Sequence, residues 1–236
     1  MSDALVEFSA VVKPYLALRP LRIANLTVMP GAVVSVQGPD AQAAEVLVGL
    51  LTAAFLPEEG VVRLFGQSTA EIVDYEAWLA MLDGLGLVSD RAVLLGQCSV
   101  AQNLALPLTL EIEPMRPDVL TRVEAMAAEV GIGRDALDTP VARADAEVVQ
   151  RLRLGRALAL GPRLVVAEHP SAPLPRDSVA AFARDLARVV TARGAALLAI
   201  SADREFIKAL GGTALTLDPK SGLLSRPGLL ARLGLG

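Results

Sequence analysis

The stretch that decides the fold is MPGAVVSVQGPDAQAAEV, residues 29–46. Pro30 and Gly31 mark a turn, the apolar run 32–37 indicates a buried strand, and Gly38 starts the next turn. From Ala43 to residue 55 the apolar spacing becomes helical. A strand, a glycine turn and a helix in this order form a phosphate-binding architecture, because backbone N–H groups and the helix N-terminus then point at the anion.

On either side of this stretch, strand and helix patterns alternate. We expect further strands at 5–12, 20–29, 60–66, 163–167, 195–200 and 213–217, and helices at 118–130, 146–160, 178–193 and 203–211. This alternation indicates a mainly parallel sheet with helices on both faces. Helical patterns dominate the region from about 100 to 160, which predicts an inserted helical subdomain.

Composition narrows the function classes. The 236 residues are 53% hydrophobic with a net charge of -4, and no basic patch with interleaved aromatics is present, so nucleic acid is not an expected partner. The single cysteine, Cys98, excludes an internal disulfide, and with one histidine, His169, no zinc site is expected. Asp3 and Glu7 stand where a secretory signal would be basic, and no window of about 18 residues is apolar and uncharged, so we expect a cytoplasmic protein without a membrane span.

Four segments in order carry a family resemblance: 29–39, 93–108, Gln150 with Arg151, and 155–164. Their order and spacing resemble the ATP-binding domains of ABC transporters across most of the chain. The resemblance implies an α/β, P-loop NTPase-like (RecA-like) core with a mainly parallel sheet, N-terminal antiparallel strands and an inserted α-helical subdomain. It implies one domain over 1–236, with the core at about 1–89 and 161–236 and the helical subdomain at about 90–160.

The loop that corresponds to the family's Walker A motif departs from it. The family sequence runs Gly-Pro-Ser-Gly-Ser-Gly-Lys-Ser-Thr, and the aligned residues are Gly38, Pro39, Asp40, Ala41, Gln42, Ala43, Ala44, Glu45 and Val46. Alanine at 41 and 43 removes the freedom for positive φ. The phosphate-binding lysine is Ala44, the Mg²⁺-binding hydroxyl is Glu45, and no lysine occurs between residues 14 and 207. We expect the helix to begin early and fill the phosphate site, with Glu45 complementing its N-terminus.

The other family motifs are altered too. The Q-loop glutamine corresponds to Asp90, the Walker B aspartate to Glu168, the general base to His169, the D-loop aspartate to Pro175 and the switch histidine to Ala202. The signature, Leu-Ser-Gly-Gly-Gln in the family, is here Ala144, Asp145, Ala146, Glu147 and Val148. Tyr15 could stack on an adenine ring, although packing is the commoner role for such a tyrosine. A catalytic ATPase needs all these parts together, so neither catalytic nor cofactor-binding residues nor a metal site are expected.

Three functions stay open at this point. The first is a non-catalytic ABC-type subunit, a scaffold or regulator of a membrane transport complex, with lipid or envelope transport hinted at by 103–108. It would sit at the inner face of the cell membrane on an ABC permease or another ABC-type subunit, as a homo- or heterodimer, and the stretch from Asp90 through Pro107 would line the docking groove. The second is a divergent ATPase that binds ATP and Mg²⁺, with Glu168 for the metal and His169 as base. The third is a soluble interaction module without a transporter.

Overall fold

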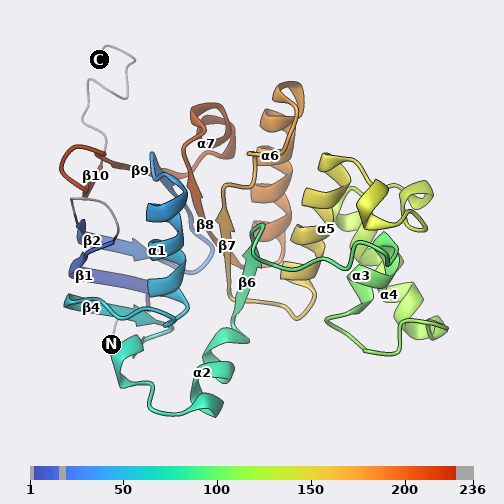
Figure 1. Cartoon of the computed structure of the whole chain (residues 1–236), viewed down its shortest axis with the longest axis horizontal. Coiled ribbons are helices and arrows are strands. Elements are labelled where there is room, and N and C mark those ends of the chain that lie inside the picture. Colours follow the sequence, from blue (N-terminus) through green and yellow to red (C-terminus); the bar gives the residue numbers. More distant parts are fainter. Residues whose placement is uncertain (1–2, 16–19, 227–236) are drawn as a thin grey trace.

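A computed structural model describes residues 3–15 and 20–226. In this part of the chain, ten strands form one sheet in the order β5-β4-β1-β2-β10-β9-β3-β8-β7-β6 (Figure 1). The strands are β1 (Val6–Lys13), β2 (Leu21–Val28), β3 (Val33–Gln37), β4 (Glu59–Leu64), β5 (Gln67–Ser68), β6 (Leu85–Val88), β7 (Leu164–Glu168), β8 (Ala196–Ser201), β9 (Thr213–Leu217) and β10 (Leu223–Ser225). The α-helices are α1 (Ala41–Leu51), α2 (Tyr75–Leu82), α3 (Val100–Ala105), α4 (Pro117–Val130), α5 (Ala146–Leu158), α6 (Arg176–Ala192) and α7 (Arg204–Leu210).

The centre of the sheet is parallel and apolar. Strand β3 pairs in parallel with β8 and β9, β8 with β7, and β7 with β6. Every residue of β7 and β8 is buried, as expected for strands covered on both faces. The carboxyl ends of β3, β6, β7 and β8 therefore meet at one edge, which is where open α/β sheets bind their ligands.

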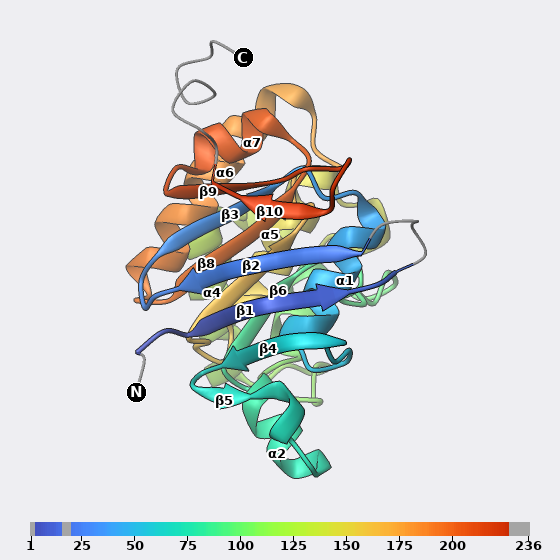
Figure 2. The same ribbon diagram turned by 90° about the vertical axis from the view of Figure 1, so that its left-hand side faces the viewer.

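The other half of the sheet is mainly antiparallel. Strand β1 pairs with β2 on one side and with β4 on the other, and β4 pairs with β5. Figure 2 shows β1, β2 and β4 side by side with α1 behind them. The predicted fold class is confirmed, including the N-terminal antiparallel strands.

Two hydrophobic cores lie on the two faces of the sheet. One contains α1 and the antiparallel strands, with Phe8, Leu47 and Leu50 almost fully buried. The other joins α6 and α7 to α3, α4 and α5, around Phe182 and Phe206. Helices α3, α4 and α5 pack on one another and form the lobe at the right of Figure 1.

Helix α1 differs at both ends from the predicted bounds of 43–55, and its start before Ala43 confirms the expectation of an early beginning. It begins at Ala41 because Asp40 caps it, and it ends at Leu51. Ala53 then turns the chain with φ 56°, so Phe55 folds back and donates its N–H to the Gly49 carbonyl. A Cβ at Gly49 would lie 2.2 Å from the Phe55 ring, so this contact needs glycine.

Other boundaries and elements also differ from the sequence expectations. The helix predicted at 178–193 spans Arg176–Ala192, the one at 146–160 ends at Leu158, and the first strand spans Val6–Lys13 instead of 5–12. Four strands and α-helices were not predicted, namely α2, β5, β6 and β10, and α3 was expected only as part of the helical region at about 100–160. Helix α2 buries only Met81 among its residues, which leaves little amphipathic signal, and the three missed strands have two to four residues each.

Candidate functional site

The loop after β3 is held in place by a backbone hydrogen bond of Gly38 and by the side chain of Asp40. Gly38 has φ 100° and donates its N–H to the Ser201 carbonyl, and a Cβ there would lie 2.9 Å from the Leu217 carbonyl oxygen. The Asp40 carboxylate accepts from the Ala43 N–H at 2.8 Å and so caps α1. A carboxylate of the chain thus occupies one of the backbone N–H groups that a helix N-terminus offers to an anion.

A guanidinium bridges this helix to β7. Arg91 Nε lies 3.1 Å from Glu168 Oε2, and Arg91 Nη2 lies 3.3 Å from Glu45 Oε2. The Glu168 side chain is 7% exposed and also accepts from the Ser89 hydroxyl at 2.6 Å. Glu45 lies beyond the first turn of α1, so the expectation that it complements the helix N-terminus is wrong, and its partner is Arg91 instead.

These contacts fix the charge of Arg91. Burial lowers the pKa of Arg91, but the hydrogen bond and charge of Glu168, together with Glu45, outweigh it and raise that pKa above the usual value. Arg91 was not among the site residues predicted from the sequence. One signal in the sequence could have pointed to Arg91, because Glu45 and Glu168 both align with metal-binding positions. Two carboxylates that face each other in a partly buried place require a cation between them.

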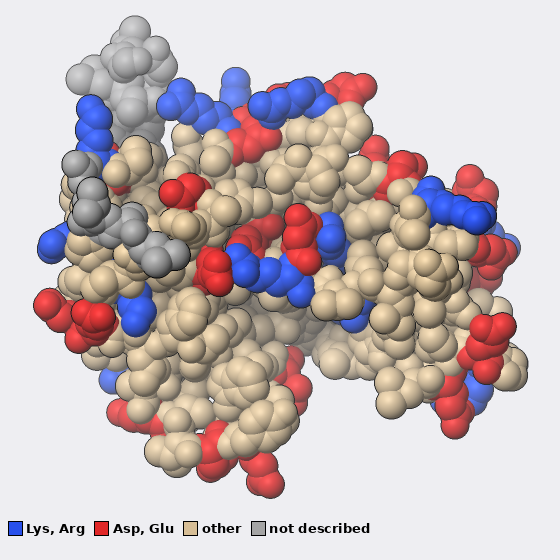
Figure 3. Space-filling view, in the orientation of Figure 1, with Lys and Arg blue, Asp and Glu red and all other residues tan. Residues whose placement is uncertain are grey.

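The bridge forms one wall of a pocket of about 580 Å³. Three carboxylates, one guanidinium and one imidazole line it, together with small residues: Pro39, Asp40, Ala41, Ser89, Asp90, Arg91, Glu168, His169, Ala172 and Ala202. The fold therefore brings together the positions aligned with Walker A, Q-loop, Walker B and switch histidine. Figure 3 shows charges of both signs gathered at the middle of this face.

His169 lies in that pocket in an unusual backbone conformation. Its φ is 42°, and its N–H is bound to the Ile200 carbonyl. Within the described ranges, its Nε2 is buried and has no hydrogen-bond partner. Tyr15 packs against the core that contains α1, and burial and the Asp40 charge raise the pKa of Tyr15. No group of three or more His, Cys, Asp or Glu side chains that could hold a metal ion occurs among the described residues.

Asp90 points away from the bridge, toward the helical lobe. It pairs with Arg153 of α5 at 2.6 Å and its side chain is 72% exposed. Its neighbour Arg91 pairs with the core strand β7 and with α1. Two adjacent residues of opposite charge thus attach the loop after β6 to the helical lobe and to the core. Arg156 Nη1 adds a hydrogen bond to the Val93 carbonyl at 2.6 Å.

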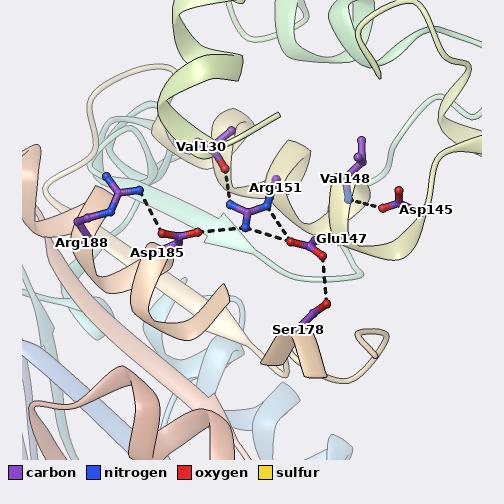
Figure 4. Close-up of polar contacts among 8 residues, drawn as sticks. All are labelled: Val130, Asp145, Glu147, Val148, Arg151, Ser178, Asp185 and Arg188. Carbon is purple, nitrogen blue, oxygen red and sulfur yellow. Dashed lines mark hydrogen bonds and ion pairs between the residues drawn. The ribbon is translucent and has the colours of Figure 1, made fainter. Parts of the chain in front are cut away.

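The signature-equivalent residues are also satisfied within the chain (Figure 4). Asp145 caps α5 by accepting from the Val148 N–H at 2.8 Å. Glu147 accepts from Arg151 at 3.1 Å and from the Ser178 hydroxyl at 3.1 Å. A shallow pocket there is lined by Gly131, Asp145, Ala146, Glu147, Val148, Arg151 and Pro175, so the D-loop position lies beside the signature. Ala144, before the cap, packs against the second core.

Arg151 holds this corner together. Its guanidinium donates to the Val130 carbonyl at 2.8 Å and to Asp185 at 3.0 Å, and Asp185 also pairs with Arg188. Burial raises the pKa of Asp185, but the hydrogen bonds and charges of the two arginines lower it overall. The helix N-terminus that would meet a phosphate is therefore edged by carboxylates held in fixed positions.

A separate groove lies between α2, β6 and α5. It is lined by Leu82, Asp83, Leu85, Gly86, Leu87, Ala92, Leu94, Pro107, Arg153, Arg156, Ala157, Leu160 and Pro162, and its volume is about 210 Å³. Figure 3 shows a notch between the lobe that carries α2 and the lobe that carries α3 and α4. Part of the predicted docking stretch, at Ala92, Leu94 and Pro107, lines this groove.

Comparison with known proteins identifies the family. No family model matches the sequence. The lipoprotein-releasing system ATP-binding protein of Anaeromyxobacter dehalogenans is 30% identical over 190 residues, which cover 78% of this chain and 79% of the relative. The chain belongs to the family of ABC transporter ATP-binding proteins. The corresponding ABC protein of Maricaulis maris is 29% identical, with 87% of this chain and 90% of the relative covered. A methionine import ATP-binding protein of Xanthomonas oryzae is 26% identical, and this chain spans 64% of its length.

Solved ABC structures confirm the fold. CbiO1 from Clostridium perfringens, described as part of an ABC transporter complex, superposes with a TM-score of 0.78 at 15% identity and covers 99% of this chain and 93% of its own. A dimeric bacterial ABC transporter cassette superposes with a TM-score of 0.75 at 19% identity and covers 94% of this chain and 97% of its own. In the described ranges, no helix is long and apolar enough to cross a membrane.

Proposed function

We propose that this ABC protein is a non-catalytic subunit of a membrane transport complex, in which it acts as scaffold or regulator. The observation that carries the proposal is the bridge from Glu45 through Arg91 to Glu168. A magnesium–nucleotide complex brings its own cation and several negative oxygens. At this edge of the sheet, the cation position is taken by a guanidinium and the anion position is edged by Asp40.

The residues present fit MgATP poorly. The Ala43 N–H already binds a carboxylate, and Ala44, in place of the phosphate-binding lysine, is fully buried. Each lost charge-assisted contact weakens binding by roughly 1.5–3 kcal/mol, so the absence of lysine and of the metal-binding hydroxyl removes enough to abolish micromolar affinity. Asp145 and Glu147 place negative charge, the sign that a phosphate carries, at the signature. This supports inactivity toward a nucleotide bound by a partner subunit as well.

The groove between α2, β6 and α5 supports a docking role that needs no nucleotide. We propose one domain with a core at 1–89 and 161–236 and a helical subdomain at 90–160, and the groove lies where the two meet. Relatives named as lipoprotein-releasing proteins point to an envelope transport system. The partner would be an ABC permease or another ABC subunit, and the protein would lie at the cytoplasmic face of the membrane, as a homo- or heterodimer.

Titration calorimetry with MgATP tests the proposal. We expect no heat of binding at millimolar nucleotide, because the site supplies neither lysine nor a free metal position. A saturable isotherm with a Kd below about 100 μM, equivalent to more than about 5 kcal/mol of binding, would overturn it. Co-purification with a membrane permease would support the transport role, and its absence would favour a soluble interaction module.

One observation favours residual ATP hydrolysis as a second candidate. His169 stands at the general-base position, and its Nε2 is buried without a partner in the described residues. Histidine is a common general base, which is the role that this candidate assigns to His169. A Mg²⁺-dependent nucleotide affinity would separate this candidate from the scaffold.

A further inference from the structure

The cavity at the carboxyl edge of the sheet stays open, although Ala44 stands in place of the family's phosphate-binding lysine. Its volume is about 580 Å³, and much of its lining is small and apolar: Pro39, Ala41, Ala172 and Ala202. Cavities of this size hold small organic molecules, which combine apolar contacts with a few polar ones. The polar groups of the lining therefore decide which molecule fits.

The charges around this cavity do not balance. Two guanidiniums pair with three of the four carboxylates at this edge, Arg91 with Glu45 and Glu168, and Arg153 with Asp90. The fourth carboxylate, Asp40, is exposed and has no ion-pair partner within residues 3–15 and 20–226. It accepts one hydrogen bond, from the Ala43 N–H, so it can still accept others. The surplus of negative charge favours a cation in the cavity.

One imidazole nitrogen at the cavity lacks a hydrogen-bond partner. His169 is part of the lining, and its Nε2 is buried and unpaired among the described residues. His169 also lines a smaller cavity of about 320 Å³, where Asp203 is already bound by Ser171 and Arg176. Because nearly all buried polar atoms in proteins have a partner, the unpaired Nε2 indicates a position for a polar group of a bound molecule.

We propose that the cavity of about 580 Å³ binds a small organic cation, which pairs one ammonium group with Asp40 and donates a second N–H to His169 Nε2. The inference rests on the proposed absence of a nucleotide and assigns a ligand of different chemistry to the same cavity. A neutral imidazole accepts a hydrogen bond at the nitrogen that carries no proton. The small apolar side chains would contact the hydrocarbon part of the molecule.

An organic cation fits this cavity better than a metal ion or an anion does. The described part of the chain holds no group of three His, Cys, Asp or Glu side chains that could bind a metal ion. An anion would lie near Asp40, and the guanidinium of the lining, Arg91, is already shared by two carboxylates. An ammonium group needs neither a shell of oxygen ligands nor an unpaired arginine.

Three molecules with the same four-carbon chain test the charge preference by titration calorimetry on the full chain. Putrescine carries an ammonium group at each end, butanediol a hydroxyl group and succinate a carboxylate. Putrescine should bind saturably at one site per chain, and the other two should give no saturable heat. An absence of saturable putrescine binding would overturn the proposal, and so would a preference for succinate or butanediol.

Substitution of Asp40 locates the ammonium group. Asp40→Ser keeps an oxygen that can cap α1 but removes the charge, so putrescine should bind about tenfold more weakly or worse. Asp74→Ser makes the same change at the cap of α2, away from the cavity, and should bind putrescine as the wild type does. Equal affinity in the wild type and Asp40→Ser would overturn the proposal, because the heat would then report general attraction to an acidic protein.

The second contact has a direct readout, because His169 is the only histidine of the chain. Nuclear magnetic resonance of protein without a histidine tag should show that putrescine shifts the Nε2 signal and that Asp40→Ser reduces this shift. His169→Asn, which keeps a residue type that tolerates positive φ, should weaken binding about tenfold. If that variant does not fold, the Nε2 signal of the wild type decides.

Saturable putrescine binding that leaves the Nε2 signal unmoved would overturn the assigned site. A saturable MgATP isotherm would overturn the proposed non-catalytic function and this inference with it. If neither MgATP nor putrescine binds, this inference alone is wrong and the proposed function stands.

Discussion

Arg91 Nε lies 3.1 Å from the buried Oε2 of Glu168, although 77 residues separate the two in the chain. The pair joins the loop after β6 to the end of β7, and Glu45 extends it to α1. In an ABC domain, this place lies between the phosphate loop and the Walker B strand. Under the proposed scaffold role, the Arg91 guanidinium takes the place of a bound cation between these carboxylates.

Removal of the guanidinium should destabilise the fold. Arg91→Met leaves Glu168 buried with the Ser89 hydroxyl as its remaining side-chain partner, so the free energy of unfolding should fall by about 2 kcal/mol. Urea denaturation followed by circular dichroism measures this. Arg134→Met breaks an ion pair whose arginine is 82% exposed and should cost less than about 0.5 kcal/mol.

A double-mutant cycle isolates the pair. Glu168→Gln in the Arg91→Met background removes the unpaired charge, so it should recover part of the lost stability. If the changes in the free energy of unfolding caused by the two substitutions are additive, the contact does not stabilise the fold, and the idea that Arg91 replaces a bound cation is wrong.

The Asp40 cap gives a second prediction. Asp40→Ala removes the acceptor for the Ala43 N–H and should lower stability by about 1 kcal/mol, whereas Asp40→Ser keeps a capping oxygen and should be near neutral. Asp74→Ala, which removes a cap of the same type from α2, is the matched control for a lost cap away from the site. An equal loss for Ser and Ala at position 40 would show that the carboxylate acts through charge rather than by capping.

The sequence predicted most of the core because its elements bury periodic apolar faces. The buried runs of β3, β7 and β8 and the amphipathic α6 follow directly from such patterns. Helix α2 was missed because its burial is slight. The aligned positions of the site do converge, but Arg91 was missed, since its role depends on a path that brings α1, β6 and β7 together and no local pattern encodes it.

The groove between α2, β6 and α5 shows the same limit. The resemblance to the ABC family predicted that the stretch from Asp90 to Pro107 lines the groove, and part of that stretch does. Leu82 and Leu85 on one side and Arg153 and Arg156 on the other come from segments far apart in sequence. Which of these side chains meet, and how exposed they stay, depends on packing, which the sequence alone does not specify.

Stability should depend on pH through Asp185. Its pKa in the folded protein lies below the ordinary 3.8, so ionised Asp185 stabilises the fold above that value and the contribution is lost as pH falls through the lowered pKa. The stability difference between wild type and Asp185→Asn should therefore be constant from neutral pH to about 5 and shrink below about 4. Urea denaturation across this range measures it, and Asp177→Asn, at an exposed position of α6, is the control. A difference that persists at pH 2 would mean that the carboxylate acts by packing alone.

Restoring the lysine alone should not restore nucleotide chemistry. Ala44→Lys alone should give no affinity for ATP, because Ala44 is fully buried, Asp40 still occupies the Ala43 N–H, and Arg91 still pairs with Glu168. One charge-assisted contact contributes roughly 1.5–3 kcal/mol, whereas millimolar affinity already needs about 4 kcal/mol.

Replacement of residues 40–46 by the family loop removes Asp40 and Glu45 and supplies glycines, so calorimetry should detect tighter binding than in the single variant. Hydrolysis should stay absent even then, since Asp145, Glu147 and Ala202 are unchanged and Arg91 keeps the Glu168 carboxylate. Steady-state phosphate release from the rebuilt protein is the measurement. If turnover exceeds the enzyme-free rate and the His169→Ala substitution abolishes this turnover, then His169 is a working base and the protein is an ATPase.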